Sequence, residues 1–447
     1  MSKLELRDYQ KADLEFALSR DRSCNFSECG TGKSPTFSRY IYMRYLMNGA
    51  KTVFIMPSGI MKKNQEDICE WTPFSEDEVV IVRGNPKQRL SIYENSNIKV
   101  FIISANTFSN EWKLMLEKQP DINSIVIDEN HLLYSTHTSK RTQQLYLASR
   151  KIQYFYACTG TPLNGRFSSV YPLCAICEPR FYFNYQTFLN YHGVYDNFGR
   201  IVAWGRPEKL KKVLQYLGPR HTFEECYPNS KGYQLFVEKA DIDENLKENY
   251  QQLEEEALLE LEDQYLECDN PAVKAMRARV LLSCPEMLNL ENKPKFNGKD
   301  EVLKVHLENA KEEKSRILIF SCFQAEQIRV KNICEEMGLK VEIINGGVSS
   351  KKRGEIDTAF RNHDLDVVIG SPQTCSVGFN WEFAKEVIFL SMDYQDSSFE
   401  QGIKRLDRGT RKTAIPVYLI SYKTKVEKRI INIVKRKMKE KVEVFGL

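Results

Sequence analysis

The sequence predicts an α/β protein with two doubly wound parallel-sheet domains joined by a helical, acidic insertion. Three observations predict this architecture. Short apolar runs alternate with helical patterns over residues 52–162, as strands and helices alternate around a parallel sheet. The pattern becomes helical and charged between residues 207 and 292, and the alternation then returns over residues 317–420.

Each expected strand is a short run rich in β-branched or aromatic side chains, which suit a buried parallel sheet. In the first half these runs cover residues 23–26, 52–56, 79–82, 100–103 and 125–127. In the second half they cover residues 317–320, 341–344, 367–369, 387–390 and 417–420. We expect a first domain over 1–206, the insertion over 207–295 and a second domain over 296–447.

Composition indicates a soluble protein rather than a membrane protein. The chain has 447 residues, of which 42% are hydrophobic and 28% charged, as is usual for globular proteins. No apolar run approaches the 18 residues needed to span a bilayer, and the first residues lack the apolar core of a signal peptide. Twelve scattered cysteines suit a reducing compartment, so we expect a cytoplasmic protein.

The cysteines show one CxxC pair, Cys174 and Cys177. A zinc or redox site would use such a pair, but no second pair stands at ligand spacing and the six histidines do not cluster nearby. Cysteine also serves as a small buried hydrophobe. We favour that interpretation and expect no structural zinc.

Charge is distributed unevenly along the chain. Residues 401–447 carry 14 basic and 4 acidic side chains, whereas residues 221–270 carry 3 basic and 15 acidic ones. A basic segment attracts phosphate backbones, and an acidic one should stay away from them. Two solvated helical faces would give the same counts, and for the acidic segment we prefer that interpretation.

The most informative motif is a glycine-rich loop at residues 27–34, Ser-Glu-Cys-Gly-Thr-Gly-Lys-Ser. It lies between a strand-like run and a helical pattern. A phosphate chain needs bare backbone N–H groups, a cation at the outer phosphates and a hydroxyl on Mg²⁺. Gly30, Gly32, Lys33 and Ser34 supply these, and the helix N-terminus adds a favourable dipole. Ser27 departs from the general pattern, which begins with glycine, and a surface turn is the alternative.

A carboxylate pair, Asp128 and Glu129, follows an apolar run. The carboxyl end of a buried parallel strand is where open α/β sheets bind ligands. Asp128 would hold Mg²⁺ together with Ser34 or through water, and Glu129 would polarise the attacking water. The alternative is a helix cap or turn after a core strand.

Two arginines near the C-terminus, Arg405 and Arg408, are three residues apart and would share a helix face. Arginines presented across a cleft can stabilise charge on a transferred phosphoryl group. An ordinary basic helix is the alternative.

Further short motifs accompany the loop and the carboxylates in a fixed order. They are residues 6–10, Pro57 with Asn64, Ile68 and Trp71, residues 159–164, residues 276–285, residues 317–323, residues 345–347 with Arg353 and Phe360, Ser371 with Gly378, Asn380 and Ala384, and Gln401 with Arg405 and Arg408. In this order they resemble the motifs of superfamily 2 helicases of the Swi/Snf-type branch. The resemblance runs from about Leu6 to Ile420.

This resemblance implies two RecA-like domains, ATP and Mg²⁺ as cofactors, and hydrolysis by Lys33, Asp128, Glu129, Arg405 and Arg408. The residues that it implies for nucleotide binding are Gln10 as adenine reader, Cys29, Gly30, Thr31, Gly32, Lys33, Ser34, Gly378, Arg405 and Arg408. It implies Ser34 and Asp128 as the magnesium ligands. Two departures stand out: Asn130 replaces the usual alanine of the second motif, and residues 374–381 lack the usual glycine-rich pattern.

The resemblance also implies DNA as partner, with single strands, duplexes and branched structures as candidate substrates. The expected nucleic-acid contacts are Lys62, Ser104, Asn106, Ser321, Arg353, Ser371 and Thr374. Serine and asparagine at such positions equally serve as turn residues or caps. Without accessory modules in its sequence, the chain is similar to small phage-encoded helicases, including those that migrate branched DNA, and would then work in the host cytoplasm.

Three functions remain open at this stage. The favoured one is a translocase or helicase that remodels branched DNA. The second is a motor that tracks duplex DNA and displaces bound proteins without separating strands. The third is a nucleic-acid-binding protein with residual ATPase activity. An RNA substrate is also open, because phosphate contacts do not distinguish the sugars. An aromatic side chain such as Trp112, Trp204 or Trp381 could part strands or stack on a base, although aromatics at such spacing usually lie in the core.

Overall fold

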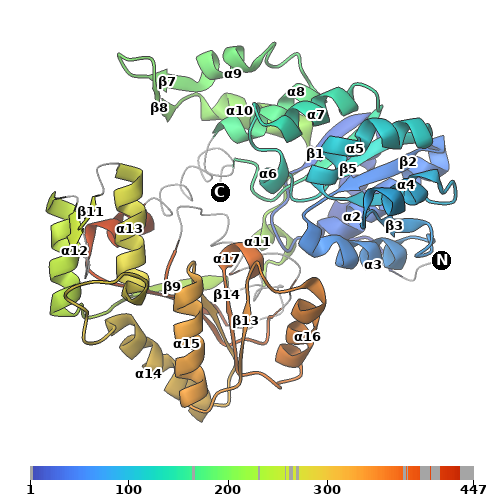
Figure 1. Ribbon diagram of the computed structural model, residues 1–447. Coiled ribbons are helices and arrows are strands. Elements are labelled where there is room, and N and C mark those ends of the chain that lie inside the picture. Colours follow the sequence, from blue (N-terminus) through green and yellow to red (C-terminus); the bar gives the residue numbers. More distant parts are fainter. Residues whose placement is uncertain are drawn as a thin grey trace. The chain divides into compact units, whose positions relative to one another are not determined.

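The structure is a computed structural model and describes residues 4–163, 167–229, 232–256, 258–260, 265–267, 271–375, 379, 381–392, 403 and 413–432. These residues form two compact units, the first ending at Pro228 and the second beginning at Asn229 (Figure 1). No helix in the described part of the chain is both long and apolar enough to cross a membrane.

The first unit contains a six-stranded parallel sheet in the order β1-β6-β5-β2-β4-β3. Its strands are β1 (Arg22–Asn25), β2 (Lys51–Ile55), β3 (Val79–Ile81), β4 (Val100–Ile103), β5 (Ile122–Ile127) and β6 (Tyr154–Cys158). All five strands expected in this half of the sequence are therefore confirmed. The sequence interpretation missed β6, which lies between β1 and β5.

Helices cover both faces of this sheet. The helices of the unit are α1 (Asp8–Leu18), α2 (Lys33–Asn48), α3 (Met61–Trp71), α4 (Pro86–Glu94), α5 (Ala105–Lys118), α6 (Asn130–Leu133), α7 (Lys140–Ser149), α8 (Tyr171–Cys177), α9 (Tyr185–His192), α10 (Pro207–Leu217) and α11 (Phe223–Cys226). Two 3₁₀ turns, η1 (Ser58–Ile60) and η2 (Phe167–Val170), and a hairpin of β7 (Gly193–Tyr195) and β8 (Ile201–Trp204) complete the unit.

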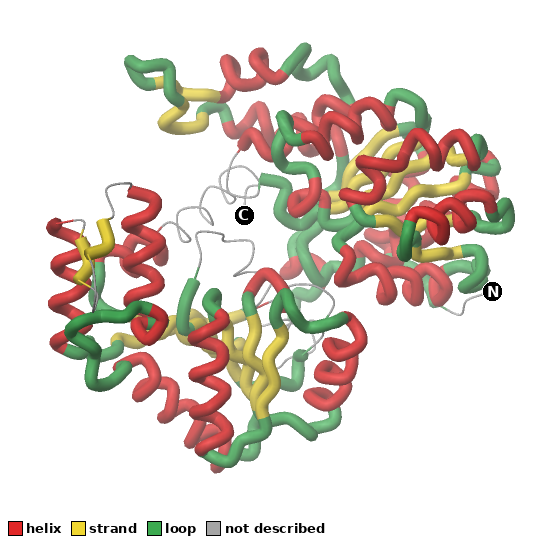
Figure 2. Tube along the Cα trace, in the orientation of Figure 1, coloured by secondary structure: helices red, strands yellow, loops and turns green. Residues whose placement is uncertain are grey.

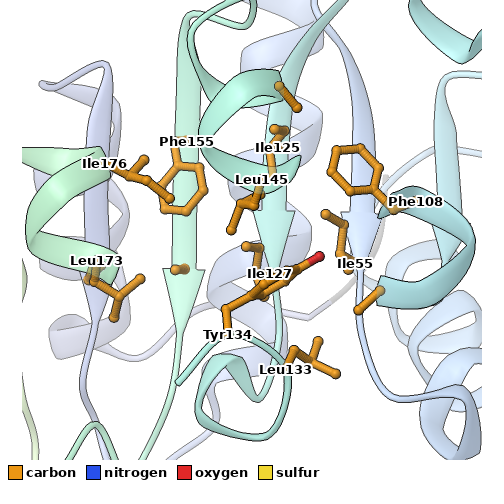
Figure 3. Close-up of a cluster of buried hydrophobic side chains, with 14 of the residues drawn as sticks. Ile55, Phe108, Ile125, Ile127, Leu133, Tyr134, Leu145, Phe155, Leu173 and Ile176 are labelled. Carbon is orange, nitrogen blue, oxygen red and sulfur yellow. The ribbon is translucent and has the colours of Figure 1, made fainter. Parts of the chain in front are cut away.

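Alternating side chains of the strands build the core on the two faces. On one face, Ile125 and Ile127 of β5 and Phe155 of β6 lie against Leu145 of α7 and Phe108 of α5 (Figure 3). On the other face, Phe54 and Tyr156 contact the rings of Phe37 and Tyr40 from α2. Because successive residues of a strand point to opposite faces, both faces are apolar and both require a helical cover.

The second unit has its own six-stranded parallel sheet in the order β13-β14-β12-β15-β16-β9. Its strands are β9 (Tyr233–Lys239), β12 (Ile317–Phe320), β13 (Val341–Ile344), β14 (Val367–Gly370), β15 (Glu386–Phe389) and β16 (Ile415–Ser421). Its helices are α12 (Glu244–Glu256), α13 (Pro271–Ser283), α14 (Gly298–Glu312), α15 (Gln324–Glu336), α16 (Ser350–Arg361) and α17 (Pro372–Cys375), with the 3₁₀ turn η3 (Pro285–Met287) and a small hairpin of β10 (Leu258–Glu260) and β11 (Tyr265–Glu267).

Both sheets consist of parallel strands flanked by helices (Figure 2), so the predicted fold class is confirmed. The compact units divide the chain at 228/229, and the domain boundaries expected at 206 and 295 stay a prediction. The expected insertion is thereby shared: α10 and α11 belong to the first unit, and β9, α12 and α13 to the second. The acidic segment contributes an edge strand, β9, because its Tyr233–Lys239 run pairs with β16 along its whole length.

Candidate nucleotide site

The glycine-rich loop joins the end of β1 to the start of α2, as the sequence predicts. Gly30 and Gly32 adopt φ angles of +87° and +82°, and Gly32 caps α2. A side chain at Gly32 would also meet Gln10 Nε2 at 2.6 Å. Both glycines are therefore required by backbone conformation, and the second also by close packing.

The loop offers the donors that a phosphate chain needs. Within the described residues, the backbone amides of Gly30, Gly32, Lys33 and Ser34 have no hydrogen-bond partner. The Lys33 amine donates to the carbonyl oxygens of Ser27 and Glu28, at 2.8 Å each. These two carbonyls hold the ammonium group of Lys33 inside the loop. A bound anion could replace them as the partner of the ammonium group.

The departure at Ser27 has a structural reason. Its hydroxyl accepts a hydrogen bond from the amide of His221 at 3.2 Å, and its own amide donates to Asn25 Oδ1 at 2.9 Å. Ser27 is fully buried. A glycine here would lack the hydroxyl that binds the loop to a segment from far along the chain.

That segment, Pro219–Tyr227, covers the loop and was missed by sequence reasoning. The amides of Phe26 and Glu28 donate to the carbonyls of Pro219 and His221. Arg220 forms an ion pair with Glu28 at 3.0 Å. The loop and this segment are 192 to 195 residues apart in sequence. A local sequence pattern cannot predict a contact over that separation.

The covering segment also contacts α1. His221 Nε2 lies 2.8 Å from Asp13 Oδ1, and this hydrogen bond raises the pKa of His221. Asp13 also accepts from Asn25 at the end of β1. The Arg7 guanidinium stacks over the ring of Tyr227 at 4.8 Å. α1, β1 and the covering segment therefore form one polar cluster around the loop.

Gln10, the expected adenine reader, is already engaged in the loop. Its Nε2 donates to the carbonyl of Gly32 at 2.9 Å, and its Oε1 accepts from the amide of Arg7 at 2.9 Å. The neighbouring Tyr9 hydroxyl donates to the carbonyl of Thr31 at 2.6 Å. In this structure, then, Gln10 positions the phosphate loop; its role toward adenine stays a prediction.

The carboxylate pair lies at the same edge of the sheet as the loop. Because β1, β6 and β5 are parallel neighbours, their carboxyl ends bring the loop, Thr159–Gly160 and Asp128–Glu129 together. Gly160 abuts the loop directly: a Cβ there would lie 2.9 Å from the amide nitrogen of Cys29. Thr159 in turn bonds His131 Nδ1 at 2.9 Å, which joins the loop to the residues after β5.

The two carboxylates are buried and repel each other. Asp128 and Glu129 are 9% and 8% exposed, and Glu129 adopts a left-handed conformation with φ of 51°. Burial, with the nearby charge of Glu129, raises the pKa of Asp128 to about 7, against the opposing effect of Lys33. A buried carboxylate of this kind is stabilised by a bound cation.

The donor set fits magnesium. Asp128 Oδ1 accepts the Glu129 amide at 2.9 Å, and the Ser34 hydroxyl stands in the first turn of α2. No group of three or more His, Cys, Asp or Glu side chains that could hold a metal ion occurs among the described residues. One carboxylate and one hydroxyl, completed by phosphate oxygens and water, is the ligand set that Mg²⁺ usually takes.

The CxxC pair lies elsewhere, on α8. Cys174 is buried, and Cys177 Sγ lies 3.7 Å from Cys24 Sγ of β1. Burial raises the pKa of Cys174 and of Cys24. Both thiols therefore pack as protonated apolar groups.

Gly378, Arg405 and Arg408 lie outside the described residues. Their predicted roles at the nucleotide stay predictions. The described part of the site thus comes from the first unit: Gln10, Cys29, Gly30, Thr31, Gly32, Lys33, Ser34, Asp128 and Glu129.

The residues expected to contact nucleic acid have varied surroundings. In the first unit, Lys62 and Asn106 are exposed, and Ser104 caps α5 by accepting from the Thr107 amide. In the second unit, Ser371 and Thr374 bond each other at 2.7 Å. Arg353 donates to the carbonyl of Asn345 at 2.9 Å, and its Nε has no partner among the described residues.

Ser321 differs from the other expected contacts because it is fully buried. Its hydroxyl donates to Glu326 Oε2 at 2.6 Å. Glu326 is buried as well, and burial raises the pKa of its carboxyl. This geometry makes Ser321 a partner of a core carboxyl in this structure, and its contact with nucleic acid stays a prediction.

Two family models match this chain. A family model described as an SNF2-related domain matches residues 9–269, and one described as a helicase conserved C-terminal domain matches residues 298–410. An uncharacterized ATP-dependent helicase of Mycoplasma pneumoniae is 22% identical over 96% of this chain and 41% of its own length. A chromodomain-helicase-DNA-binding protein 3 homolog of Caenorhabditis elegans is 23% identical over 80% of this chain and 20% of its own length.

Among solved structures, the chain resembles the Sulfolobus solfataricus SWI2/SNF2 ATPase core in complex with dsDNA. The two share 18% sequence identity with a TM-score of 0.45, over 98% of this chain and 93% of that one. This chain spans about two fifths or less of the two curated relatives named above. Because the SNF2-related model covers more than half of its residues, the chain belongs to the SNF2-related family.

Proposed function

We propose that this protein is an ATP-dependent DNA translocase and helicase. The observation that carries the proposal is the sheet edge at which the Lys33 loop, the Asp128–Glu129 pair and Gly160 meet. Phosphoryl transfer requires a loop with free backbone amides beside a buried carboxylate pair, and this site has that arrangement. The SNF2-related match supports the same activity.

The residues divide the chemistry among themselves. The ammonium group of Lys33 leaves the carbonyls of Ser27 and Glu28 and binds the outer phosphates. Ser34 and Asp128 would hold Mg²⁺, which supplies charge stabilisation on the phosphates when bound. Glu129 accepts a hydrogen bond from the attacking water and orients it.

We further propose that Arg405 and Arg408 complete the site from the second domain. Arginine donors would stabilise the charge that develops on the transferred phosphoryl group. Domain closure around ATP and opening after hydrolysis would then move the protein along a strand.

The DNA substrate that we favour is a branched one, such as a fork or recombination intermediate. The resemblance to small phage-encoded helicases favours this substrate and remains a prediction, as does a phage origin. A translocase that displaces proteins from duplex DNA is the second candidate, and the SNF2-related match supports it as well. RNA and a residual ATPase remain the alternatives.

The first test is steady-state ATP hydrolysis without nucleic acid and with single-stranded DNA, duplex DNA, a four-way junction or single-stranded RNA. Stronger stimulation by the junction than by duplex would support branch remodelling, and equal stimulation would support the duplex translocase. Hydrolysis that none of these stimulates would contradict the motor function.

Replacing Lys33 with alanine tests the nucleotide site itself. Lys33→Ala removes the cation at the outer phosphates, so we expect hydrolysis to fall by a factor of about 100 or more while DNA binding persists. Lys63→Ala is the matched control, because Lys63 is exposed and, among the described residues, pairs only with Asp67 of its own helix. Wild-type turnover by the Lys33 variant would show that the site is misassigned.

A further inference from the structure

The β7–β8 hairpin of the first unit carries apolar side chains that the core does not use. Phe198 at its turn is 84% exposed, and Val194, Tyr195 and Val202 on its strands are exposed as well. The hairpin extends from α9 beyond the helices that cover the sheet (Figure 1). Exposed apolar groups gathered on one projecting element indicate an interaction site.

The turn holds Phe198 in a defined position. Asp196 Oδ1 accepts hydrogen bonds from the amides of both Phe198 and Arg200, at 2.9 Å each. The amide of Gly199 donates to the Asp196 carbonyl at 3.1 Å, and Gly199 adopts φ of +74°. This network defines the backbone of the turn, and the Phe198 ring at its tip is exposed to solvent.

The base of the hairpin is anchored to the body of the unit. Trp204 stacks on Phe167 with ring centroids 5.8 Å apart and an interplanar angle of 16°. The buried ring of His192 bonds the Gly205 carbonyl at 3.0 Å and the Tyr182 hydroxyl at 2.6 Å. Force on the tip would therefore be transmitted to the first unit.

Charge on the hairpin and on the α10 segment that follows it favours a polyanion. The Arg200 guanidinium lies 6.0 Å from the centre of the Phe198 ring. Residues 193–212 contain five basic side chains, Arg200, Arg206, Lys209, Lys211 and Lys212, against two acidic ones, Asp196 and Glu208. In the described part of the chain, Arg200 and the three lysines pair with no carboxylate. A stacking ring beside Arg200, with further cations on the following helix, suits bases and phosphates together.

We propose that the β7–β8 hairpin is a strand-separating wedge, in which Phe198 stacks on the last base pair while Arg200 binds the phosphate backbone. This inference rests on the proposed function and specifies it, because a pure duplex translocase needs no wedge. Phe198 thereby takes the place of all three tryptophans considered from the sequence. Trp112 and Trp381 are buried in the cores, and Trp204 anchors the base of the hairpin.

The test compares Phe198→Ala, Phe198→Trp and Phe183→Ala with the wild-type chain on a forked duplex. Phe183 is a matched control, because it is 90% exposed in the same unit but outside the hairpin. Strand separation and DNA-stimulated ATP hydrolysis are measured together. We expect Phe198→Ala to slow separation about tenfold, from the loss of one stacked base, with hydrolysis within about twofold of wild type. Phe198→Trp and Phe183→Ala should behave like wild type.

Three results would overturn the wedge. One is unchanged separation by Phe198→Ala, as expected if the hairpin instead binds a protein. Another is an equal loss in Phe198→Trp. The third is a wild-type protein that hydrolyses ATP on duplex DNA yet parts no strands, which leaves the translocase proposal intact. Failure of the proposed function itself is distinguishable, because then no DNA would stimulate hydrolysis.

Discussion

The buried carboxylate of Asp128 makes a prediction that links the nucleotide site to stability. Asp128→Asn removes a negative charge from beside Glu129 while keeping the shape of the side chain. Burial and the charge of Glu129 raise the pKa of Asp128 from 3.8 to about 7. A carboxyl with a raised pKa contributes most to stability below its unfolded value of 3.8, and this contribution is lost as the pH rises through about 7.

The size of the effect follows from the same values. The folded and unfolded pKa values of Asp128 differ by about 3, and each unit corresponds to about 1.4 kcal/mol. Compared with an uncharged side chain, the raised pKa of Asp128 therefore lowers the free energy of unfolding by up to about 4 kcal/mol near pH 8, and by about 2 kcal/mol near pH 5.5, where the unfolded carboxyl ionises but the folded one does not. Since asparagine carries no charge, Asp128→Asn should regain this energy in the nucleotide-free protein and lose ATP hydrolysis.

The assay is thermal unfolding in EDTA at about pH 5.5 and about pH 8, and ATP hydrolysis is measured separately in buffer that contains Mg²⁺. Asp77→Asn is the control, because Asp77 is exposed in the same unit and should change the free energy of unfolding by less than about 0.5 kcal/mol. An Asp128→Asn protein that is no more stable than wild type near pH 8, or gains equally at both pH values, would refute the electrostatic reasoning.

Two further predictions concern packing and a buried histidine. Gly160→Ala places a methyl group 2.9 Å from the Cys29 amide nitrogen, so it should displace the loop and cost about 1–3 kcal/mol of stability. ATP binding, measured by titration, should weaken, and wild-type affinity would contradict this. In the second unit, burial would lower the pKa of His306, but its hydrogen bonds to Glu386 and Glu238 outweigh this and raise it. The resulting stability is present below the unfolded pKa of 6.5 and is lost as the pH rises through the folded value. His306→Gln should therefore destabilise more near pH 6 than near pH 9 in melting experiments, and an equal loss at both pH values would argue against a charged His306.

The chemistry of the nucleotide site could be predicted from sequence because it is local. A phosphate loop needs two glycines, a lysine and a serine within a few residues, and Lys33 stands where that pattern requires. Asp128 and Glu129 likewise follow a single apolar strand. Strand runs such as 52–56 and 125–127 were visible because a sheet covered on both faces requires an uninterrupted apolar run.

Other features depended on pairings that no local pattern encodes. β6 was missed although it is apolar, and β9 lies in an acidic segment whose charges suggested a helical insertion. The covering segment Pro219–Tyr227 reaches the loop from about 190 residues away. The hydrogen bond between the His221 amide and the Ser27 hydroxyl is a contact of the folded chain, so only the structure shows that this segment covers the loop.

The sequence by itself determined which residue types can bind and cleave a nucleotide, and in which order they occur. Only the tertiary structure decided that Gly160 touches the loop, that Asp128 is buried enough to shift its pKa, and that Phe198 is exposed while Trp381 is not. The physical reason is that burial and close approach are properties of neighbours in space. Chain topology brings those neighbours together, and residues far apart in sequence supply them.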